Sequence, residues 1–382
     1  MQYRHFGKLD LKPSLLGFGA MRLPIIDGDS SKINEDEAIK MIRASIDGGV
    51  NYVDTAYPYH SGNSEYTVAK ALKDGYREKV SLASKNPTWL LEKEGDFTKY
   101  LDEQLKKLEV DCIDFYLQHA FEGERWKIFK NLNVFEEAQK AKTDGKIKYF
   151  GFSFHAEYDV FEDIINEYDW DFCQIQYNYL DEGYQAGTKG LELAASKNIG
   201  VVVMEPLRGG RLADKMPEDL VEEYNQAKVK RSNVDWALRW VANHPEVSLI
   251  LSGMSTMEQV QENLKICSAE DILPGSALNE EEAAMIKHIA DTWNKRILVG
   301  CTACNYCMPC PAGINIPECF AAYNLFGSAA ASAVGASKKQ YKELVESGSG
   351  ADKCINCGAC VSQCPQSIQI PEKLAELHKV LS

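Results

Sequence analysis

The sequence predicts an α/β fold: a (β/α)8 TIM barrel with a short N-terminal β-hairpin, followed by a small, mostly helical iron–sulfur domain. Two observations predict this organisation. Eight short apolar runs alternate with longer amphipathic segments up to residue 254, and eight of the twelve cysteines fall between Cys301 and Cys364. A repeated alternation of strand and helix is the pattern of a closed parallel barrel.

The length and composition limit what this chain does. Its 382 residues exceed what one core usually serves. We therefore expect a barrel over 1–278, a connecting helix over 279–298 and an iron–sulfur domain over 299–382. The net charge of −14 opposes binding to nucleic acid or to an anionic membrane, which leaves small molecules or protein partners. The first residues lack a signal peptide's apolar core, and no apolar run is long enough to cross a bilayer, so we expect a cytoplasmic protein.

The barrel elements follow one another in order. The segment YRHFGKLDLKPS predicts the hairpin, because Gly7 and Lys8 supply a turn between two short arms that could cap the bottom of the barrel. The eight runs are rich in Val, Ile, Tyr and Phe without strict alternation, which favours strands buried on both faces. They begin at Leu15, Asn51, Val80, Cys112, Tyr149, Phe172, Gly200 and Val247. The segments between them indicate helices, as in DEAIKMIRASIDGG, which a glycine pair ends.

The C-terminal region contains a repeated unit. CPAGINIP from Cys310 and CPQSIQIP from Cys364 share Cys-Pro and Ile-x-Ile-Pro at the same offsets. The alanine-rich residues 316–350 between them predict two helices joined by a flexible link. This domain is therefore expected to be helical rather than a compact, β-rich ferredoxin.

The cysteine spacing predicts two [4Fe-4S] clusters. The second run, CINCGACVSQCP, fits the ferredoxin pattern in which the fourth cysteine binds the other cluster, whereas the first run, CTACNYCMPCP, is one residue short before its Cys-Pro. By this crossing rule Cys301, Cys304, Cys307 and Cys364 hold one cluster, and Cys310, Cys354, Cys357 and Cys360 hold the other. A zinc site is the alternative, but it leaves no use for a third cysteine in each run. Cys112, Cys173, Cys267 and Cys319 are predicted to be small buried hydrophobic residues.

Polar residues at the ends of three neighbouring strands predict the catalytic site. Asp54, with Tyr59 five residues on, Lys85 and His119 end the second, third and fourth runs, and barrel enzymes do their chemistry at this end. Each has an ordinary structural explanation by itself, but together they suit proton donation to a carbonyl that receives a hydride. A lysine ammonium lowers a tyrosine's ordinary pKa of about 10 by stabilising the phenolate. Tyr59 would then donate the proton, Asp54 would hold Lys85, and a histidine N–H would orient the carbonyl.

At these residues, positions 1 to about 275 resemble the aldo-keto reductases. The matching segments are DTAYPY, Lys85, DFYLQH, GKIKYFGFS, QIQYN, EPLRGG and SGMSTMEQVQEN. The resemblance implies that Tyr59 is the general acid, that Asp54, Lys85 and His119 complete a tetrad, and that NAD(P)H binds without a Rossmann motif. The chain as a whole resembles a subgroup of this family with C-terminal ferredoxin-type clusters, and its tail is similar to the α-helical ferredoxins.

The same resemblance implies the cofactor contacts. Ser153 and Gln174 would meet the nicotinamide carboxamide, the Leu207–Gly210 loop the pyrophosphate, and Glu262 with Asn263 the adenine. The full set of implied cofactor-binding residues is Ser153, Gln174, Met204, Pro206, Leu207, Gly209, Gly210, Ser252, Gly253, Gln259, Glu262 and Asn263. Phe154 replaces the family's usual asparagine, and Met204 stands where a tyrosine commonly stacks on nicotinamide. Gln259 takes the place of the usual arginine, so no cation pairs with a 2′-phosphate, which favours NADH.

Two functions are consistent with these residues. The first is a NAD(P)H-linked oxidoreductase that acts on a small aldehyde or ketone, or on the corresponding alcohol, with the clusters relaying electrons to or from a protein partner. The second is an electron-transfer or redox-sensing protein whose barrel is a scaffold or binds another cofactor, such as a flavin. The second stays open because a nicotinamide gives two electrons as a hydride, whereas each cluster passes one. A purely structural role for the clusters is a third reading.

Overall fold

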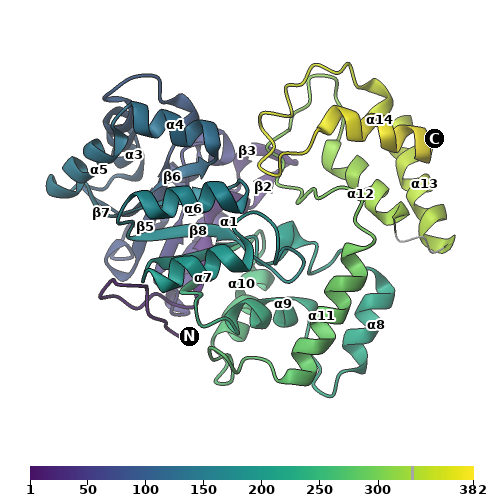
Figure 1. The fold of residues 1–382 in the computed structure, drawn as a ribbon, viewed down its shortest axis with the longest axis horizontal. Helices are drawn as coiled ribbons and strands as arrows, with labels where there is room; N and C mark the ends of the chain where they lie inside the picture. Colours follow the sequence, from purple (N-terminus) through teal and green to yellow (C-terminus); the bar gives the residue numbers. More distant parts are fainter. Residues whose placement is uncertain (328–330) are drawn as a thin grey trace. The chain divides into compact units, whose positions relative to one another are not determined.

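The computed structural model describes residues 1–327 and 331–382 (Figure 1). The chain forms two compact units. The first unit comprises Met1–Leu207 and Arg231–Glu280, and the second comprises Arg208–Lys230 and Glu281–Ser382. A segment from the middle of the barrel sequence therefore belongs with the C-terminal unit.

The first unit contains a closed barrel of eight parallel strands, as the sequence predicts. The strands are β1 (Leu16–Gly19), β4 (Tyr52–Asp54), β5 (Ser81–Asn86), β6 (Ile113–Phe121), β7 (Ile147–Phe154), β8 (Phe172–Gln176), β9 (Gly200–Met204) and β10 (Leu249–Gly253). Each predicted run overlaps one of them, and β1 pairs with β10 to close the barrel. Because all strands run the same way, their carboxyl ends meet at one end.

Helices surround the barrel strands. They are α1 (Glu35–Asp47), α2 (Ser64–Ala71), α3 (Asp96–Leu108), α4 (Gly123–Asn131), α5 (Val134–Thr143), α6 (Tyr158–Glu167), α7 (Gly187–Ser196), α9 (Asn233–Ala242) and α10 (Met257–Cys267). Short 3-10 turns also occur, namely η1 (Ala20–Arg22), η2 (Tyr59–Gly62), η3 (Arg77–Lys79) and η4 (Thr88–Leu90). Side-chain caps begin several helices, as where Ser232 accepts the Asp235 N–H of α9 and Thr256 accepts the Gln259 N–H of α10.

The predicted N-terminal hairpin forms as two isolated antiparallel bridges, Tyr3 with Ser14 and Phe6 with Leu9. Phe6 is completely buried, and its ring lies 5.3 Å from that of Phe115 and 6.0 Å from that of Phe172. These rings belong to one cluster that also contains Tyr52 at the start of β4. Phe6 therefore closes the end of the barrel at which the strands begin. The polar residues predicted to be catalytic lie at the opposite end, where the strands finish.

The second unit is helical among its described residues, as expected. Its elements are η5 (Arg208–Gly210), α8 (Glu218–Gln226), α11 (Glu280–Asn294), α12 (Ile316–Phe326), α13 (Ala331–Glu346), η6 (Ala351–Lys353) and α14 (Ile370–Leu381). The predicted flexible link between α12 and α13 falls at 328–330, outside the described residues. The repeated Ile-x-Ile-Pro segments become the first turns of α12 and α14, with proline at a position where a helix needs no N–H.

Two packing regions hold the second unit together. Buried Phe320, Tyr341, Leu374 and Leu377 join α12, α13 and α14 in one core. The helices α8 and α11 lie side by side (Figure 1), and Arg296, just beyond α11, contacts both carboxylate oxygens of Asp219 at 3.0 and 2.7 Å. Across the described part of both units, no helix has the length and apolarity to cross a membrane.

Candidate active site and iron–sulfur sites

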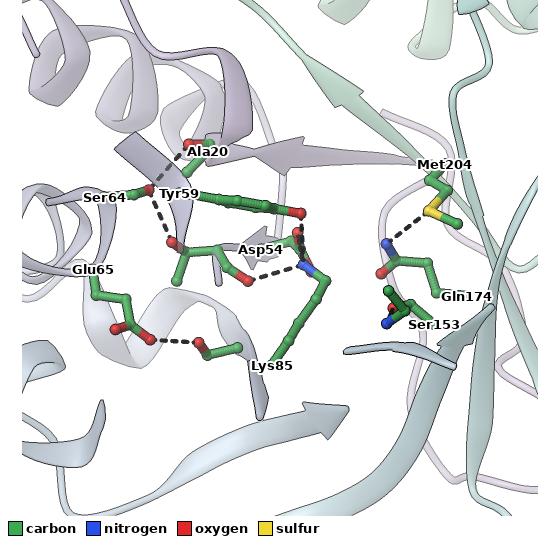
Figure 2. Close-up of polar contacts among 12 residues, drawn as sticks. Ala20, Asp54, Tyr59, Ser64, Glu65, Lys85, Ser153, Gln174 and Met204 are labelled. Carbon is green, nitrogen blue, oxygen red and sulfur yellow. Dashed lines mark hydrogen bonds and ion pairs between the residues drawn. The ribbon is translucent and has the colours of Figure 1, made fainter. Parts of the chain in front are cut away.

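Neighbouring strands bring three of the four predicted catalytic residues to one end of the barrel. Asp54 is the last residue of β4, Lys85 lies near the end of β5, and His119 lies near the end of β6. In the parallel register Asp54 lies opposite Ala83 and Lys85 opposite Leu117. Tyr59 begins η2 just after β4, and Figure 2 shows its hydroxyl directed at the Lys85 amine. The structure therefore brings all four together.

Lys85 is the centre of this cluster. Its side chain is 0% exposed, and its Nζ donates to Asp54 Oδ1 at 2.5 Å, to the Thr55 carbonyl at 2.9 Å and to the Tyr59 hydroxyl oxygen at 3.4 Å. Burial lowers the pKa of Lys85, while the Asp54 carboxylate acts against that shift. Burial likewise raises the pKa of Asp54, against the attraction of Lys85. The three contacts fix the direction of the ammonium toward the tyrosine oxygen.

A second buried carboxylate supports the position of Lys85. Glu65, at the start of α2, accepts hydrogen bonds from Ser84 Oγ at 2.7 Å and from Gln104 Nε2 at 2.6 Å (Figure 2 draws the first of these). Gln104 Nε2 also lies 3.1 Å from the Lys85 carbonyl oxygen. Burial raises the pKa of Glu65. This network holds the β5 backbone on both sides of Lys85, and sequence reasoning did not identify it because Glu65 lies within a helix.

His119 lies against the tyrosine with its ring edge-on. The His119 ring centroid is 5.9 Å from that of Tyr59 and 5.3 Å from that of Trp89. Burial, and next the positive charge of Lys85, hold the pKa of His119 well below its usual value. Its Nδ1 is buried and has no hydrogen-bond partner within 1–327 and 331–382. A neutral imidazole with a free ring nitrogen suits a group that must contact a carbonyl oxygen.

Three further residues at this end were missed by sequence reasoning. Trp89 lies in η4 after β5, Arg125 in α4 after β6, and His155 directly after β7. The Arg125 guanidinium lies 5.6 Å from the Trp89 ring centroid, and its Nη1 donates to the Ala120 carbonyl at 2.7 Å. Their position immediately after strand ends was a signal that could have found them.

The predicted nicotinamide contacts lie on the next strands round the barrel. Ser153, on β7, accepts the Ala120 N–H at 2.8 Å. Gln174, on β8, donates from Nε2 to Met204 Sδ at 3.4 Å, as Figure 2 shows. Its Oε1 is buried and finds no hydrogen-bond partner in the described chain. The Gln174 amide therefore offers an unused acceptor of the kind that binds a carboxamide N–H.

The predicted adenine-side contacts lie on β10 and α10. Asn263 donates to Ser252 Oγ at 3.0 Å, and Gln259 Oε1 accepts the Ser255 N–H at 2.8 Å. Glu262 accepts from Ser232 Oγ at 2.7 Å. Pro206 and Leu207 follow β9 within the first unit, whereas Gly209 and Gly210 form η5 in the second unit.

One cation in this region was not predicted. The side chain of Arg22 lies 3.2–3.3 Å from the position that a Cβ on Gly253 would occupy. Its Nη2 is buried and makes no hydrogen bond to any residue that the structure describes. A buried guanidinium nitrogen needs an acceptor, and phosphate is an acceptor that arginine prefers. The unused donor Arg22 Nη2 and the unused acceptor Gln174 Oε1 are therefore groups of the kind that a dinucleotide would pair with.

The first cysteine set lines a small, partly enclosed cavity in the second unit. Cys301, Cys304, Cys307 and Cys364 all line it, together with the apolar side chains of Ile316, Pro317, Phe320, Ile368 and Ile370 and with Thr302, Asn305 and Gln366. These four cysteines are the set that the crossing rule assigns to one cluster, although Cys364 belongs to the second run. Thiols from both runs around one apolar cavity fit a [4Fe-4S] cluster.

The second cysteine set is more exposed. Burial raises the pKa of the Cys360 thiol, and the nearby thiols of Cys310, Cys357 and Cys354 act in the same direction. Cys310 therefore lies close to the second run, as the crossing rule expects. Cys357 is exposed, and the other three are partly exposed.

The remaining cysteines have the expected character in three of four cases. Cys173, Cys267 and Cys319 are completely buried, and burial raises the pKa of Cys267 and of Cys319 to about 12. Cys112 is only partly buried, because it precedes β6 at the edge of the barrel. No group of three His, Cys, Asp or Glu side chains in the described residues is arranged to hold a single metal ion.

Comparisons with known proteins agree with this geometry. The aldo/keto reductase family profile matches residues 15–289, and a 4Fe-4S dicluster domain profile matches residues 300–369. L-galactose dehydrogenase of Arabidopsis thaliana is 28% identical over 321 residues, which cover 77% of this chain and 97% of that protein. The NADH-specific methylglyoxal reductase of Escherichia coli is 26% identical over 342 residues, which cover 75% and 97%.

A solved structure gives the same result. The holo form of aldo-keto reductase AKR11C1 from Bacillus halodurans is 26% identical, with a TM-score of 0.63 over 76% of this chain and 96% of that one. The family profile alone spans most of the chain, and the barrel and the named relatives agree with it. This chain therefore belongs to the aldo/keto reductase family and carries a C-terminal 4Fe-4S dicluster domain.

Proposed function

We propose that this protein is a NAD(P)H-linked oxidoreductase that reduces a small aldehyde or ketone, or oxidises the corresponding alcohol, and that its two clusters relay electrons to or from a protein partner. The observation that carries the proposal is the buried Lys85, whose amine contacts both Asp54 and the Tyr59 hydroxyl. This arrangement supports proton transfer at a carbonyl oxygen.

The chain's own residues would act on the proton. A bound nicotinamide supplies or accepts the hydride. Tyr59 donates its hydroxyl proton to the carbonyl oxygen, and Lys85 stabilises the phenolate that remains, because its ammonium donates to that oxygen. Asp54 keeps the ammonium in place. Neutral His119 directs an N–H at the carbonyl oxygen and stabilises the charge that develops there.

Replacing Tyr59 with phenylalanine tests the proton donor. Tyr59→Phe should reduce NAD(P)H-linked carbonyl turnover by about 10²–10⁴-fold, the usual contribution of a general acid. The visible spectrum of the clusters should not change. Turnover is followed by NAD(P)H absorbance with a panel of small aldehydes and ketones.

Tyr57 gives a matched control. Its hydroxyl donates to Glu103 Oε2 at 3.1 Å rather than to Lys85. Tyr57→Phe should therefore retain most of the turnover. Wild-type rates in Tyr59→Phe would remove Tyr59 from the mechanism.

For the dinucleotide, NADH is the proposed cofactor, with Arg22 binding the pyrophosphate that NADH and NADPH share. Gln259 is exposed and gives no charge for a 2′-phosphate, whereas Arg22 lies against Gly253 with an unused donor. The E. coli relative is named for NADH specificity. A guanidinium forms strong charge-assisted hydrogen bonds with phosphate, which supports assigning the pyrophosphate to Arg22 and no 2′-phosphate to Gln259.

Two substitutions separate these roles. Arg22→Gln should weaken binding of NADH and of NADPH by the same factor, roughly tenfold or more for a lost charge-assisted hydrogen bond. Gln259→Arg should strengthen NADPH binding and leave NADH binding unchanged. Titration of protein fluorescence measures both. A loss confined to NADPH in Arg22→Gln would instead assign Arg22 to the 2′-phosphate.

The competing function is an electron-transfer protein whose barrel does not turn over a carbonyl. The thioether of Met204, in contact with Gln174, stands where the family's tyrosine ring commonly stacks, and it is the observation that favours this function. Anaerobic addition of NADH distinguishes the two. Bleaching of the cluster absorbance supports communication between barrel and clusters. Absence of both NADH binding and bleaching would favour the competing function.

A further inference from the structure

Ser64 and Glu65, the first two residues of α2, contact both strands that hold Lys85. Both side chains are 0% exposed. Ser64 Oγ donates to the Ala20 carbonyl at 3.0 Å and lies 2.9 Å from Thr55 Oγ1 (Figure 2). Thr55 directly follows β4, and its own carbonyl accepts the Lys85 ammonium at 2.9 Å. Ser64 therefore fixes one of the acceptors that orient Lys85.

Glu65 contacts the second of these strands. Its Oε1 accepts from Ser84 Oγ at 2.7 Å and from Gln104 Nε2 at 2.6 Å. Ser84 immediately precedes Lys85 on β5, and Gln104 Nε2 also donates to the Lys85 carbonyl at 3.1 Å. Successive side chains of a strand point to opposite faces, so Ser84 meets the helices α2 and α3 outside the barrel, whereas Lys85 points inside it. Glu65 therefore acts on Lys85 through β5, from the outer side of the barrel.

The Glu65 carboxylate is also a buried charge near the Lys85 ammonium. Burial lowers the pKa of Lys85, and Glu65 acts against that shift in the same direction as Asp54. Lys107 Nζ lies 3.5 Å from Glu65 Oε2, and its side chain is 17% exposed. Water reaches this region poorly, so charges attract one another more strongly than at the surface. The charged or titratable side chains around Glu65 are Lys107 on α3, Lys85 on β5, Tyr116 on β6 and Tyr57 after β4.

The hydrogen bonds of Glu65 do not by themselves require a charge. A glutamine carbonyl oxygen can accept from Ser84 and Gln104 in the same way, without the cost of burying a carboxylate. Burial accordingly raises the pKa of Glu65, while its partners Gln104, Ser84 and Lys107 act against that shift. The protein therefore keeps a costly negative charge behind the lysine that the proposed proton transfer uses.

We propose that Glu65 is a positioning residue for carbonyl reduction: it fixes Lys85 from outside the barrel, and its charge keeps the Lys85–Tyr59 pair protonated at alkaline pH. The inference rests on the proposed function, in which this pair delivers a proton to the carbonyl oxygen. Glu65 acts through Lys85 and not on the substrate.

The pH dependence of carbonyl reduction tests this proposal. Glu65→Gln and the wild type are assayed as full-length, cluster-loaded proteins from about pH 6 to about pH 10, with NAD(P)H absorbance as the readout. Reduction stops where the Lys85–Tyr59 pair loses its proton, which gives kcat/KM an alkaline limb. Loss of a neighbouring negative charge makes that proton easier to lose. The limb should therefore move to lower pH by about one unit, a roughly tenfold change in the protonation constant.

The kinetic constants and two controls separate position from charge. At neutral pH the KM for the carbonyl should stay near that of the wild type, because Glu65 acts through Lys85. Glu65→Asp keeps the charge but draws the carboxylate away from Ser84, so kcat should fall while the limb stays near its wild-type pH. Glu103→Gln removes a charge from α3, but Glu103 accepts from the Tyr57 hydroxyl at 3.1 Å, so neither kcat nor the limb should change.

A second variant covers a failure to fold. Glu65→Gln leaves the largely buried ammonium of Lys107 without this carboxylate. If that variant does not fold, Glu65→Gln combined with Lys107→Met takes its place, because both charges of the ion pair are then removed. The limb should again move to lower pH, since Glu65 is the member of the pair that acts on Lys85.

Three results would overturn the proposal. They are an unchanged limb in folded Glu65→Gln, a limb in Glu65→Asp that moves as far as in Glu65→Gln, and an unchanged kcat in Glu65→Asp. The proposed function is checked separately. Wild-type rates in Tyr59→Phe, or no carbonyl turnover by the wild type with either dinucleotide, would refute that function and with it the role of Glu65.

Discussion

Some of the buried side chains at the carboxyl end of the barrel strands could be predicted from the sequence, and others could not. Asp54, Lys85 and His119 were predictable because each ends an apolar run, and a polar residue there is unusual. Glu65 and Arg22 were not, because helices and loops carry charged residues everywhere. Only the fold shows that Glu65 reaches Ser84 and that Arg22 reaches Gly253.

His155 gives a prediction at this scale. Burial, more than the charge of Arg125, lowers the pKa of His155 to about 4. In the unfolded chain the His155 imidazole binds a proton near pH 6.5, whereas in the folded chain it does so only near pH 4. The folding free energy that this residue contributes is therefore complete above pH 6.5 and is lost as the pH falls toward 4, by at most about 3 kcal/mol.

Denaturant unfolding at several pH values between 7 and 4 measures this loss. His155→Gln should reduce the slope of unfolding free energy against pH in that range, whatever its effect at pH 7. Exposed His5 is the matched control, and His5→Gln should leave the slope unchanged. Identical slopes in the His155 variant and the wild type would show that another group causes the acid sensitivity.

At the scale of elements, apolar patterning predicted all eight barrel strands, because buried parallel strands leave a strong composition signal. It did not predict the small sheet of β2 (Ile25–Ile26) and β3 (Asp29–Ile33). These strands are short and Ile25 and Ile26 are exposed, so burial leaves no pattern. Asp27 and Gly28 both have positive φ, and an Asp-Gly pair directly after Ile25 and Ile26 was the available signal.

The helix α12 positions the segment that leads to Cys301. Asn324 Oδ1 accepts the N–H groups of Leu298 and Val299 at 2.9 and 2.8 Å, and its Nδ2 donates to the Val299 carbonyl at 2.8 Å. Asn324→Ala should lower the unfolding free energy of the C-terminal unit by about 2 kcal/mol, because it leaves these backbone groups unsatisfied. It should also speed the loss of cluster absorbance in a chelator.

Asn315, at the start of the same helix, provides the comparison. Its side chain makes one cap contact, to the Glu318 N–H at 3.4 Å. Asn315→Ala should lower the unfolding free energy by about 1 kcal/mol and leave the rate of cluster loss near that of the wild type. Equal rates of cluster loss in the two variants would show that Asn324 has no particular role in holding this segment.

For the whole molecule, the two units should respond differently to removal of the clusters. In the second unit Cys307, Cys310, Cys354, Cys360 and Cys364 pack against the core of Phe320 and Leu377, so cluster ligation and core packing support each other. Oxidative removal of iron should lower the unfolding temperature of that unit, by roughly 4–8 °C for each kcal/mol lost. The barrel transition should stay where it is.

Differential scanning calorimetry of loaded and iron-depleted protein, with far-ultraviolet circular dichroism, separates the two transitions. A parallel fall in both would mean that the barrel also depends on the clusters. No change in either would mean that the clusters contribute nothing to folding.

The segment Arg208–Lys230 has a consequence for how such a chain can be taken apart or assembled. It leaves the barrel sequence after β9 and rejoins it before α9, so the polypeptide passes between the units three times, after residues 207, 230 and 280. No single proteolytic cut and no single stop codon divides the protein along this boundary. To build a chimaera with a barrel that lacks the C-terminal unit, both segments of that unit have to be transferred together. They are the insert between β9 and α9 and the residues after 280.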